Sequence, residues 1–365
     1  SVGYRFSEEA YFEKAKQYVS NAKFRASYGH IGNEAIGDYM FLEAITKKGN
    51  NNSTGYSYWV NGTGTLISMM NTPSLVSSTL TWERIATTDI GLDLGFLNNR
   101  LNVTFDWFQR DTKDMLAPGM TLPATLGASA PYANSGSLRT RGWELGISWN
   151  HRFGDVDVFA SANIYDGKTK VTEYNNPNKL INQFYSGMEY GEIWGFETDR
   201  YFEESDFKGK NADGSWIYAD GVADQTGLEQ GTFVYGPGDI KFKDLDGNGV
   251  INGGDPTMKD ENGNLIPVGT VRNHGDLKKI GNSTPRYQFG ITAGFDWKGI
   301  DFEMFWQGIG KRDYFGGWGG AQFWGFTDEW CTPQTTSLDY WTEDNRDAYF
   351  PKLHHYSVNG ANHNT

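Results

Sequence analysis

The chain has 365 residues and a formal net charge of −13, from 45 acidic and 32 basic side chains. A field of this sign repels nucleic acid and anionic lipid headgroups, so we expect no nucleic-acid partner. The mean hydropathy is −0.59, and no apolar run approaches the roughly 20 residues of a spanning helix, which excludes a helical membrane protein. Aromatic residues make up 15% of the chain and glycine occurs 46 times, a composition typical of turn-rich β-structure.

The first element in chain order is a short amphipathic helix, predicted over 5–22 with Ser7 as its N-cap. We expect this helix to lie in an extracellular loop. Directly after it, Phe24, Ala26 and Tyr28 alternate with polar residues. A period of two places alternate side chains on opposite faces, so this segment is predicted to be a strand.

Three hairpins follow, and each has apolar residues at every second position. They join 90–96 to 101–107, 143–149 to 156–164, and 287–297 to 300–306. We expect one face of these strands to contact lipid and the other to line a lumen. The residues expected to face lipid are Leu92, Leu94, Val103, Phe105, Leu145 and Ile147. Those expected to face the lumen are Asp93, Thr104 and Glu144.

The connections between these strands alternate between short and long. The short turns are 97–100, 150–155 and 298–300, and the long polar loops are 109–141, 166–285 and 308–365. Outer-membrane barrels have this asymmetry, with short periplasmic turns, long extracellular loops and girdles of aromatic residues. The expected girdle residues are Trp107, Trp143, Trp149 and Trp297. A soluble β-sandwich or lectin is the alternative, because its strands also alternate.

The loop 244–255 has the spacing of a loop that wraps a hard cation. Oxygen side chains fall at positions 1, 3, 5, 9 and 12, and glycine falls at position 6. The predicted ligands are Asp244, Asp246, Asn248, the Val250 carbonyl, Asn252 through a water, and Asp255. They point to a structural Ca²⁺ ion. An Asp/Asn/Gly-rich turn without a metal is the alternative, since these residues favour turns for backbone reasons alone.

Two further features of the sequence are candidate sites. Trp318, Phe323 and Trp324 lie in a Gly-rich run and are candidates for contact with a substrate or partner, although such a loop also packs on itself. Paired acids such as Asp199, Glu203 and Glu204 meet one requirement of glycoside hydrolysis. Among 45 acidic residues chance pairs are inevitable, so we expect no catalytic residues and no enzyme.

Several short segments follow one another over nearly the whole chain, among them Lys23-Phe24-Arg25-Ala26-Ser27-Tyr28-Gly29, Thr81-Trp82-Glu83, Arg110-Asp111-Thr112, Arg141-Gly142-Trp143-Glu144, the run from Gly238 to Asp255, and Pro285-Arg286-Tyr287. Jointly and in this order, they resemble the SusC/RagA family of TonB-dependent outer-membrane transporters. The resemblance implies an all-β, antiparallel transmembrane β-barrel of 22 strands, closed by an N-terminal plug. It also implies a SusD-like surface lipoprotein as a lid, and TonB as the source of energy.

On this resemblance, residues 1–365 are expected to form part of the barrel, without the plug domain that contacts TonB and without the final strands. Residues 166–285 are expected to be a long extracellular loop region around the calcium-like loop. The expected function is import of an oligomeric nutrient, a glycan or a peptide, across a bacterial outer membrane. A secreted carbohydrate-binding β-protein and a glycoside hydrolase are the alternatives.

Overall fold

The computed structural model describes residues 1–34, 42, 47–48, 69–70, 75–77, 80–118, 125, 130–229, 231–314 and 335–354. The chain divides into two compact units. The first comprises Ser1–Asn175, Tyr185–Glu189 and Tyr287–Gly308, and the second comprises Asn176–Phe184, Tyr190–Arg286 and Ile309–Thr365. Among the described residues, no helix is long and apolar enough to cross a membrane.

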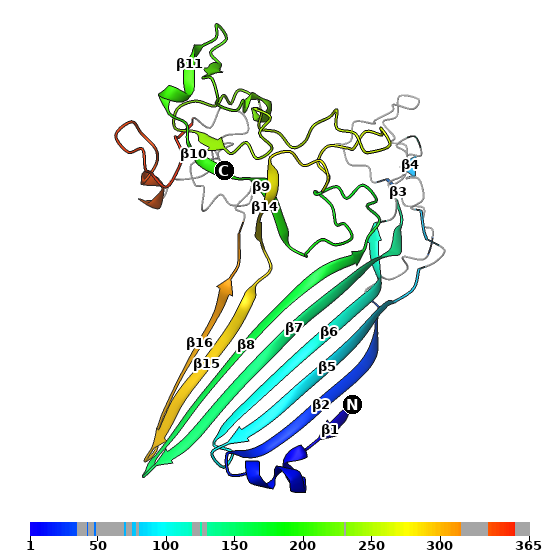
Figure 1. Ribbon diagram of the computed structural model, residues 1–365, viewed down its shortest axis with the longest axis vertical. Helices are drawn as coiled ribbons and strands as arrows, with labels where there is room; N and C mark the ends of the chain where they lie inside the picture. The colour runs from blue at the N-terminus through cyan, green and yellow to red at the C-terminus, as the bar shows by residue number, and fades with distance from the viewer. Residues whose placement is uncertain are drawn as a thin grey trace, which may run out of the picture. The chain divides into compact units, whose positions relative to one another are not determined.

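The first unit is an antiparallel sheet whose eight strands follow the order β1-β2-β5-β6-β7-β8-β15-β16, as Figure 1 shows. Each strand neighbours the next strand of this sheet along the chain, as expected for hairpins joined side by side. The strands are β1 (Val2–Tyr4), β2 (Val19–Asn33), β5 (Glu83–Phe96), β6 (Leu101–Pro118), β7 (Tyr132–Phe153), β8 (Val156–Glu173), β15 (Arg286–Trp297) and β16 (Ile300–Lys311). A separate short pair joins β3 (Lys47–Lys48) to β4 (Met69–Met70).

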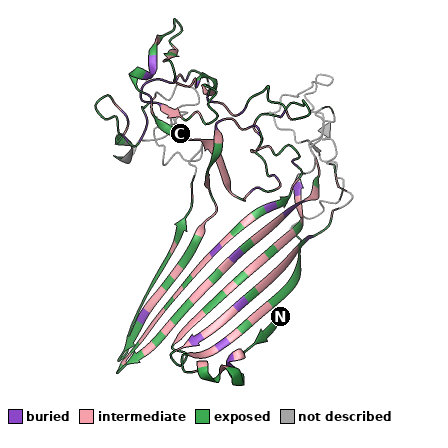
Figure 2. Ribbon diagram, in the orientation of Figure 1, coloured by how far each residue is buried: buried purple, intermediate pink, exposed green. Residues whose placement is uncertain are grey.

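One face of this sheet is apolar across six strands. The register aligns one row of side chains, which are Phe24, Leu92, Phe105, Leu145, Ile164 and Phe289. The next row contains Leu94, Val103, Ile147, Ala162 and Ile291. All six residues predicted to face lipid therefore share one face, which we call the outer face. Most residues of these strands are exposed or intermediate, and few are buried, as Figure 2 shows.

The opposite face is polar, and we call it the lumen face. It carries all three residues predicted for the lumen, because Asp93 lies opposite Thr104 and Glu144 lies opposite Asp106. Arg25 donates to both Asp93 oxygens at 2.8–2.9 Å and to Asp106 at 3.0 Å. An apolar outer face and a polar lumen face are the two surfaces of a barrel wall.

The short turns lie at one end of the sheet, as predicted. The turn after Phe96 precedes Leu101, and Leu101 pairs with Trp149 near the turn that joins β7 to β8. Trp297 pairs with Val156, which places the turn between β15 and β16 at this same end. The long connections therefore leave from the other end.

The predicted boundaries of the long loops are wrong, because the strands continue beyond the apolar band. β6 extends to Pro118, β7 begins at Tyr132 and β8 extends to Glu173. These extensions are mostly polar on both faces, so the alternation that marks a half-buried strand is missing from the sequence. The backbone pairing nevertheless continues, with Asp111 opposite Arg139 and Arg139 opposite Lys170.

The helix predicted over 5–22 is also wrong. Two 3₁₀ segments, Phe6–Glu8 and Ala10–Ala15, are followed directly by β2, and Ser7 is buried inside the first segment rather than capping it. Val19 pairs with Phe96, so the segment lies at the short-turn end of the sheet, opposite to the expected loop end. Only 14 residues join β1 to β2, and Phe6 packs edge-on against Phe12 at 5.5 Å, which favours tight turns over a continuous helix.

The second unit is built from short strands and turns around an aromatic core. Phe202, Phe207, Phe233 and Tyr235 are buried together, with Trp216 and Tyr218 packed against them. The strands are β9 (Glu192–Phe196), β10 (Thr198–Tyr201), β11 (Phe207–Lys210), β12 (Trp216–Tyr218), β13 (Ile240–Phe242) and β14 (Leu277–Asn282). They pair as β9 with β14, β10 with β13, and β11 with β12. Much of the predicted loop 166–285 is therefore ordered structure.

Candidate functional site

Two strand pairs of the second unit bring distant acidic residues together. β9 and β10 are consecutive along the chain and separated only by Glu197. β14 pairs with β9, and β13 pairs with β10. Asp276 immediately precedes β14, and Asp244 follows β13 by two residues. The two carboxylates consequently meet although 31 residues separate them in the sequence.

Glu197 links the two segments that carry these acids. Its carboxylate accepts a hydrogen bond from Lys243 Nζ at 2.7 Å and another from Lys278 Nζ. Its carbonyl also accepts from the Lys243 backbone N–H at 2.9 Å. The hydrogen bonds from Lys243 and Lys278 lower the pKa of Glu197 to about 2, so it stays ionised at neutral pH. Lys243 is next to Asp244, and Lys278 is two residues from Asp276, so Glu197 helps to fix both.

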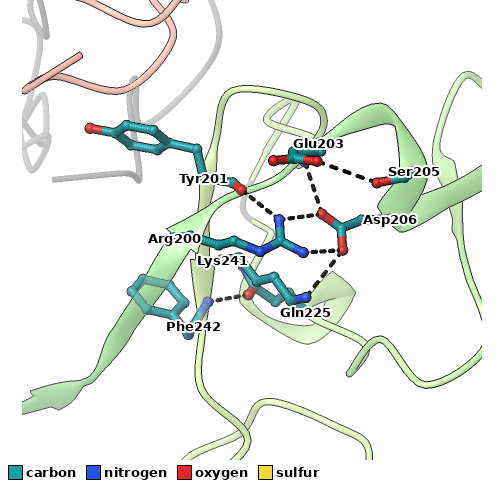
Figure 3. Close-up of polar contacts among 8 residues, drawn as sticks. All are labelled: Arg200, Tyr201, Glu203, Ser205, Asp206, Gln225, Lys241 and Phe242. Carbon is teal, nitrogen blue, oxygen red and sulfur yellow. Dashed lines mark hydrogen bonds and ion pairs between the residues drawn. The ribbon is translucent and has the colours of Figure 1, made fainter. Parts of the chain in front are cut away.

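A buried ion pair holds β13 from its other side, as Figure 3 shows. Arg200 binds Asp206 through two parallel hydrogen bonds of 2.6 and 2.7 Å, and Lys241 on β13 adds a third at 3.1 Å. The Asp206 side chain is only 5% exposed. Burial alone would raise the pKa of Asp206, but the bonds from Arg200, the Glu203 backbone N–H and Lys241 lower it to about 2.

Gln225 completes the attachment of β13. It is fully buried, accepts from the Phe242 N–H at 2.7 Å and donates to the Ile240 carbonyl at 3.0 Å, and the first of these bonds is drawn in Figure 3. Because this buried amide side chain bonds the backbone on both sides of Lys241, it fixes the strand that leads into the acidic loop.

The carboxylates of Asp244, Asp246 and Asp276 converge, with one oxygen from each lying within 4.8 Å of the others. Backbone N–H groups orient them. Asp244 accepts from Gly247 and Gly249 at 2.7 and 2.9 Å. The fully buried Asp276 accepts from the N–H groups of Leu245 and Asn252 at 2.6 and 2.9 Å. Each carboxylate oxygen has a second lone-pair direction, so these contacts leave capacity for a cation.

Like charges crowd this group. Burial raises the pKa of Asp246, and the neighbouring carboxylates of Asp276 and Asp244 raise it further, against a lowering by the Asn248 N–H. Oxygen donors are the ligands that Ca²⁺ prefers. The donor set of three carboxylates therefore fits a hard divalent cation.

The other predicted ligands on the loop lie in consecutive Asx turns. Asn248 Oδ1 accepts from the Val250 N–H at 2.7 Å, and Asn252 Oδ1 accepts from the Gly254 N–H at 2.7 Å. The Val250 carbonyl accepts from Asn252 Nδ2 at 3.3 Å. Gly249 has a φ of +82°, and Ile251 is fully buried, so the predicted turn and the predicted apolar anchor are confirmed.

Asp255 does not join the acidic group. Its carboxylate accepts from the N–H and hydroxyl of Thr257, both at 2.7 Å, while Asn273 binds its backbone N–H at 2.8 Å. Asp276 takes the third position instead. The twelve-residue spacing contains no signal for Asp276, because only the pairing of β14 with β9 brings it to the loop.

The three aromatic candidates, Trp318, Phe323 and Trp324, lie outside the residues that the structure describes. Their proposed contact with a substrate or partner stays a prediction from the sequence.

Comparison with known proteins assigns the chain to a protein family. Residues 1–227 match the family model described as "TonB dependent receptor-like, beta-barrel". The chain belongs to this family. Its members are outer-membrane proteins, so the predicted location in the bacterial outer membrane is confirmed, and the alternative of a secreted carbohydrate-binding protein is wrong. Transporters rather than enzymes make up the family.

Curated relatives support the resemblance to SusC. TonB-dependent receptor P39 of Formosa agariphila is 28% identical over 315 residues, covering 83% of this chain and 28% of the relative. SusC of Bacteroides thetaiotaomicron is 26% identical over 273 residues, covering 70% and 23%. This chain therefore spans only about a quarter to a third of the length of these relatives.

The fold matches that of a solved transporter. The RagAB peptide transporter aligns with a TM-score of 0.61 at 20% identity, covering 96% of this chain and 33% of the solved one. The RagAB peptide importer in its "closed-closed" state aligns with a TM-score of 0.60. Together with the family match, this similarity confirms the predicted barrel fold of SusC/RagA type, of which the eight strands are a part.

Proposed function

We propose that this chain forms part of the barrel wall of a transporter that imports an oligomeric nutrient across the outer membrane. The observation that carries the proposal is the two-faced sheet, apolar on the outer face and polar on the lumen face, in a chain of this family. TonB supplies the energy, and a SusD-like surface lipoprotein acts as the lid. The nutrient is a glycan or a peptide, and the similarity to the RagAB peptide transporter supports the peptide.

Uptake by cells tests this proposal. Cells that carry the full-length transporter are given fluorescent oligosaccharides in one arm and fluorescent oligopeptides of matched size in the other. We expect accumulation in one arm only, and loss of that accumulation when TonB is absent or the proton gradient is collapsed. Equal accumulation with and without TonB would contradict the proposal.

We further propose that the loop 244–255 binds a structural Ca²⁺ ion through Asp244, Asp246 and Asp276. Convergence of three carboxylates within 4.8 Å supports it, as do the Asx turns that orient the remaining oxygens. The ion would neutralise the repulsion among the three acids and order the segment that links β13 to β14.

Calorimetric titration of Ca²⁺ into the chelated full-length transporter tests the ion. Asp276→Asn is expected to weaken Ca²⁺ binding at least about 10-fold, because a ligand charge is lost. Asp260→Asn is the matched control, since Asp260 lies in a similar turn closed by Asn262 and Asn264 but outside the acidic group. No Ca²⁺ binding at millimolar metal, or equal loss in the control, would refute the site.

A further inference from the structure

Basic residues lie on the outer face of the sheet, on the long-loop side of the aromatic pair Trp107 and Trp143. Trp107 and Trp143 are directly paired neighbours on β6 and β7. Two residues further toward the long-loop end, Arg141 on β7 pairs with Lys168 on β8. After two more residues, Arg139 pairs with Lys170. We call Arg139, Arg141, Lys168 and Lys170 the basic rows.

The register places the basic rows on the outer face, and the contacts agree. Arg141 Nε donates to Gln109 Oε1 at 2.8 Å, and Gln109 in turn donates to Asp111 at 2.8 Å. The residues that alternate with these on each strand lie on the lumen face, where Phe108 stacks on Tyr165 with their ring centroids 6.1 Å apart. The four cations therefore project toward the membrane and its headgroups rather than into the lumen.

The local charge is positive although the chain as a whole is acidic. Asp111 pairs with Arg139 at 2.5 Å, and Glu189 pairs with Lys168 at 3.4 Å. Arg141 has a neutral partner in Gln109, and both Arg141 and Lys170 are exposed. Asp166, which is buried, is a third acid on this face and pairs with Trp143. Four cations against three acids still leave an excess of positive charge, where the net charge of −13 predicts repulsion of anionic headgroups.

On the outer face of these two fully described strands, the lysine and arginine residues are confined to the long-loop end. From Trp143 to Phe153 the outer face of β7 carries Trp, Leu, Ile, Trp, His and Phe, and the outer face of β8 from Val156 to Ile164 carries only Val, Ala and Ile. Since the short turns of such barrels are periplasmic, the basic rows lie at the level of the outer-leaflet headgroups.

An apolar hollow lies on the same face below the basic rows. It has a volume of about 160 Å³ and is lined by Leu145, Ile147, Ala162, Ile164, Phe289 and Ile291, with Asn163. Because the Ala162 side chain is small, a space remains between Ile147 on β7 and Ile291 on β15, the two residues that pair with it. Leu145 is four residues from Arg141, or about 13 Å along the strand. A single lipid spans this distance with its headgroup on the cations and an acyl chain in the hollow.

We propose that the basic rows and this hollow form a binding site for a phosphate-bearing glycolipid of the outer leaflet. Arginine presents N–H donors in a fork that matches phosphate oxygens, and lysine adds a point charge. The hollow is apolar and receives an acyl chain. The site thus anchors the barrel wall to the leaflet that surrounds it, independently of the transported nutrient.

Lipid binding by the full-length transporter in detergent, followed by native mass spectrometry, tests this site. The probe is lipid A, compared with its dephosphorylated form and with inorganic phosphate. Arg141→Gln with Lys170→Gln is expected to weaken binding of lipid A about 10–30-fold. Lys23→Gln with Arg110→Gln removes two charges from the lumen face and is the matched control, expected to bind as the native protein does.

Two further variants separate the headgroup from the chain. Arg141→Lys keeps the charge and is expected to retain most binding. Ala162→Phe fills the hollow and is expected to weaken lipid A without removing a charge, whereas Ala26→Phe on the outer face of β2 is not. Heat-modifiable gel mobility verifies that each variant is folded.

The lipid-binding measurements either support or overturn the proposed site. Preferential binding of phosphorylated lipid A, lost in the double variant and kept in its control, supports it. Equal binding of the dephosphorylated lipid, equal loss in the control, or binding of inorganic phosphate as strong as that of lipid A would overturn it.

Discussion

Single carboxylates determine how the second unit responds to acid. Asp206 is buried, its pKa is about 2, and it holds β10 and β13 together through Arg200 and Lys241. Its pKa in the unfolded chain is close to 3.9. Because the folded pKa is lower, the stabilisation is complete above about pH 5 and is lost as the pH falls toward 2.

Asp206→Asn is therefore expected to destabilise the second unit by about 2 kcal/mol at neutral pH and to remove this part of its acid sensitivity. Hydrogen exchange of peptides from β10 and β13, corrected for intrinsic rates, measures both effects between pH 3 and 7. Asp220→Asn is the control, since Asp220 is exposed and bonds only Lys208 among the described residues. Equal protection in the two variants would show that Asp206 is not the responsive group.

Adjacent residues on one strand are expected to differ sharply in their tolerance of charge. Leu94 is in an outer-face row and Asp93 lies on the lumen face, beside Arg25. A charge facing lipid near the bilayer midplane costs about 2–4 kcal/mol. Leu94→Arg should impair assembly more than Asp93→Arg in heat-modifiable gel mobility. The reverse order would invert the two faces of the sheet.

At the scale of elements, the register fixes which segments lie at which end of the barrel wall. Asn99 is in a short turn and Asn262 is in the second unit, between β13 and β14. With Cys331 replaced by serine, we expect Asn262→Cys to react with a membrane-impermeant label on intact cells and Asn99→Cys to react only after lysis. Labelling of Asn99→Cys on intact cells would reverse the topology.

The sequence predicts the elements inside the membrane well and those outside it poorly. Leu92, Phe105 and Leu145 lie where alternation places them because one face of each strand meets lipid and the other meets water. Beyond Trp107 that contrast ends, so the polar continuation of β6 to Pro118 has no period to detect. The 3₁₀ segments before β2 fail for another reason, since their conformation depends on a tertiary distance between strands.

The candidate cation site, too, is only partly predictable from the sequence. Local spacing correctly identifies the turn at Gly249 and the anchor at Ile251, because both depend on the loop's own backbone. Asp276 is 21 residues beyond Asp255 and reaches the loop only through the pairing of β9 with β14. No local pattern in the sequence encodes that contact.

At the scale of the whole molecule, the cation loop is expected to affect the lid. An ordered loop loses less conformational entropy when a partner docks on it. Asp244→Ala should therefore weaken binding of the lid lipoprotein to the full-length transporter without unfolding the barrel. Surface plasmon resonance with and without Ca²⁺ measures this effect, with Asp260→Ala as the control. Unchanged lid affinity in Asp244→Ala would remove the proposed role.

The central claim is that these strands form the wall of an outer-membrane barrel. Spin labels placed singly from Trp143 to Trp149 on β7 of the full-length transporter, in outer-membrane vesicles, test it most directly. We expect accessibility to oxygen, which concentrates in lipid, to peak at 143, 145, 147 and 149, and accessibility to a water-soluble nickel complex to peak at 144, 146 and 148. Accessibility without a period of two, or labels at 145 and 147 that meet the nickel complex more than oxygen, would contradict the account.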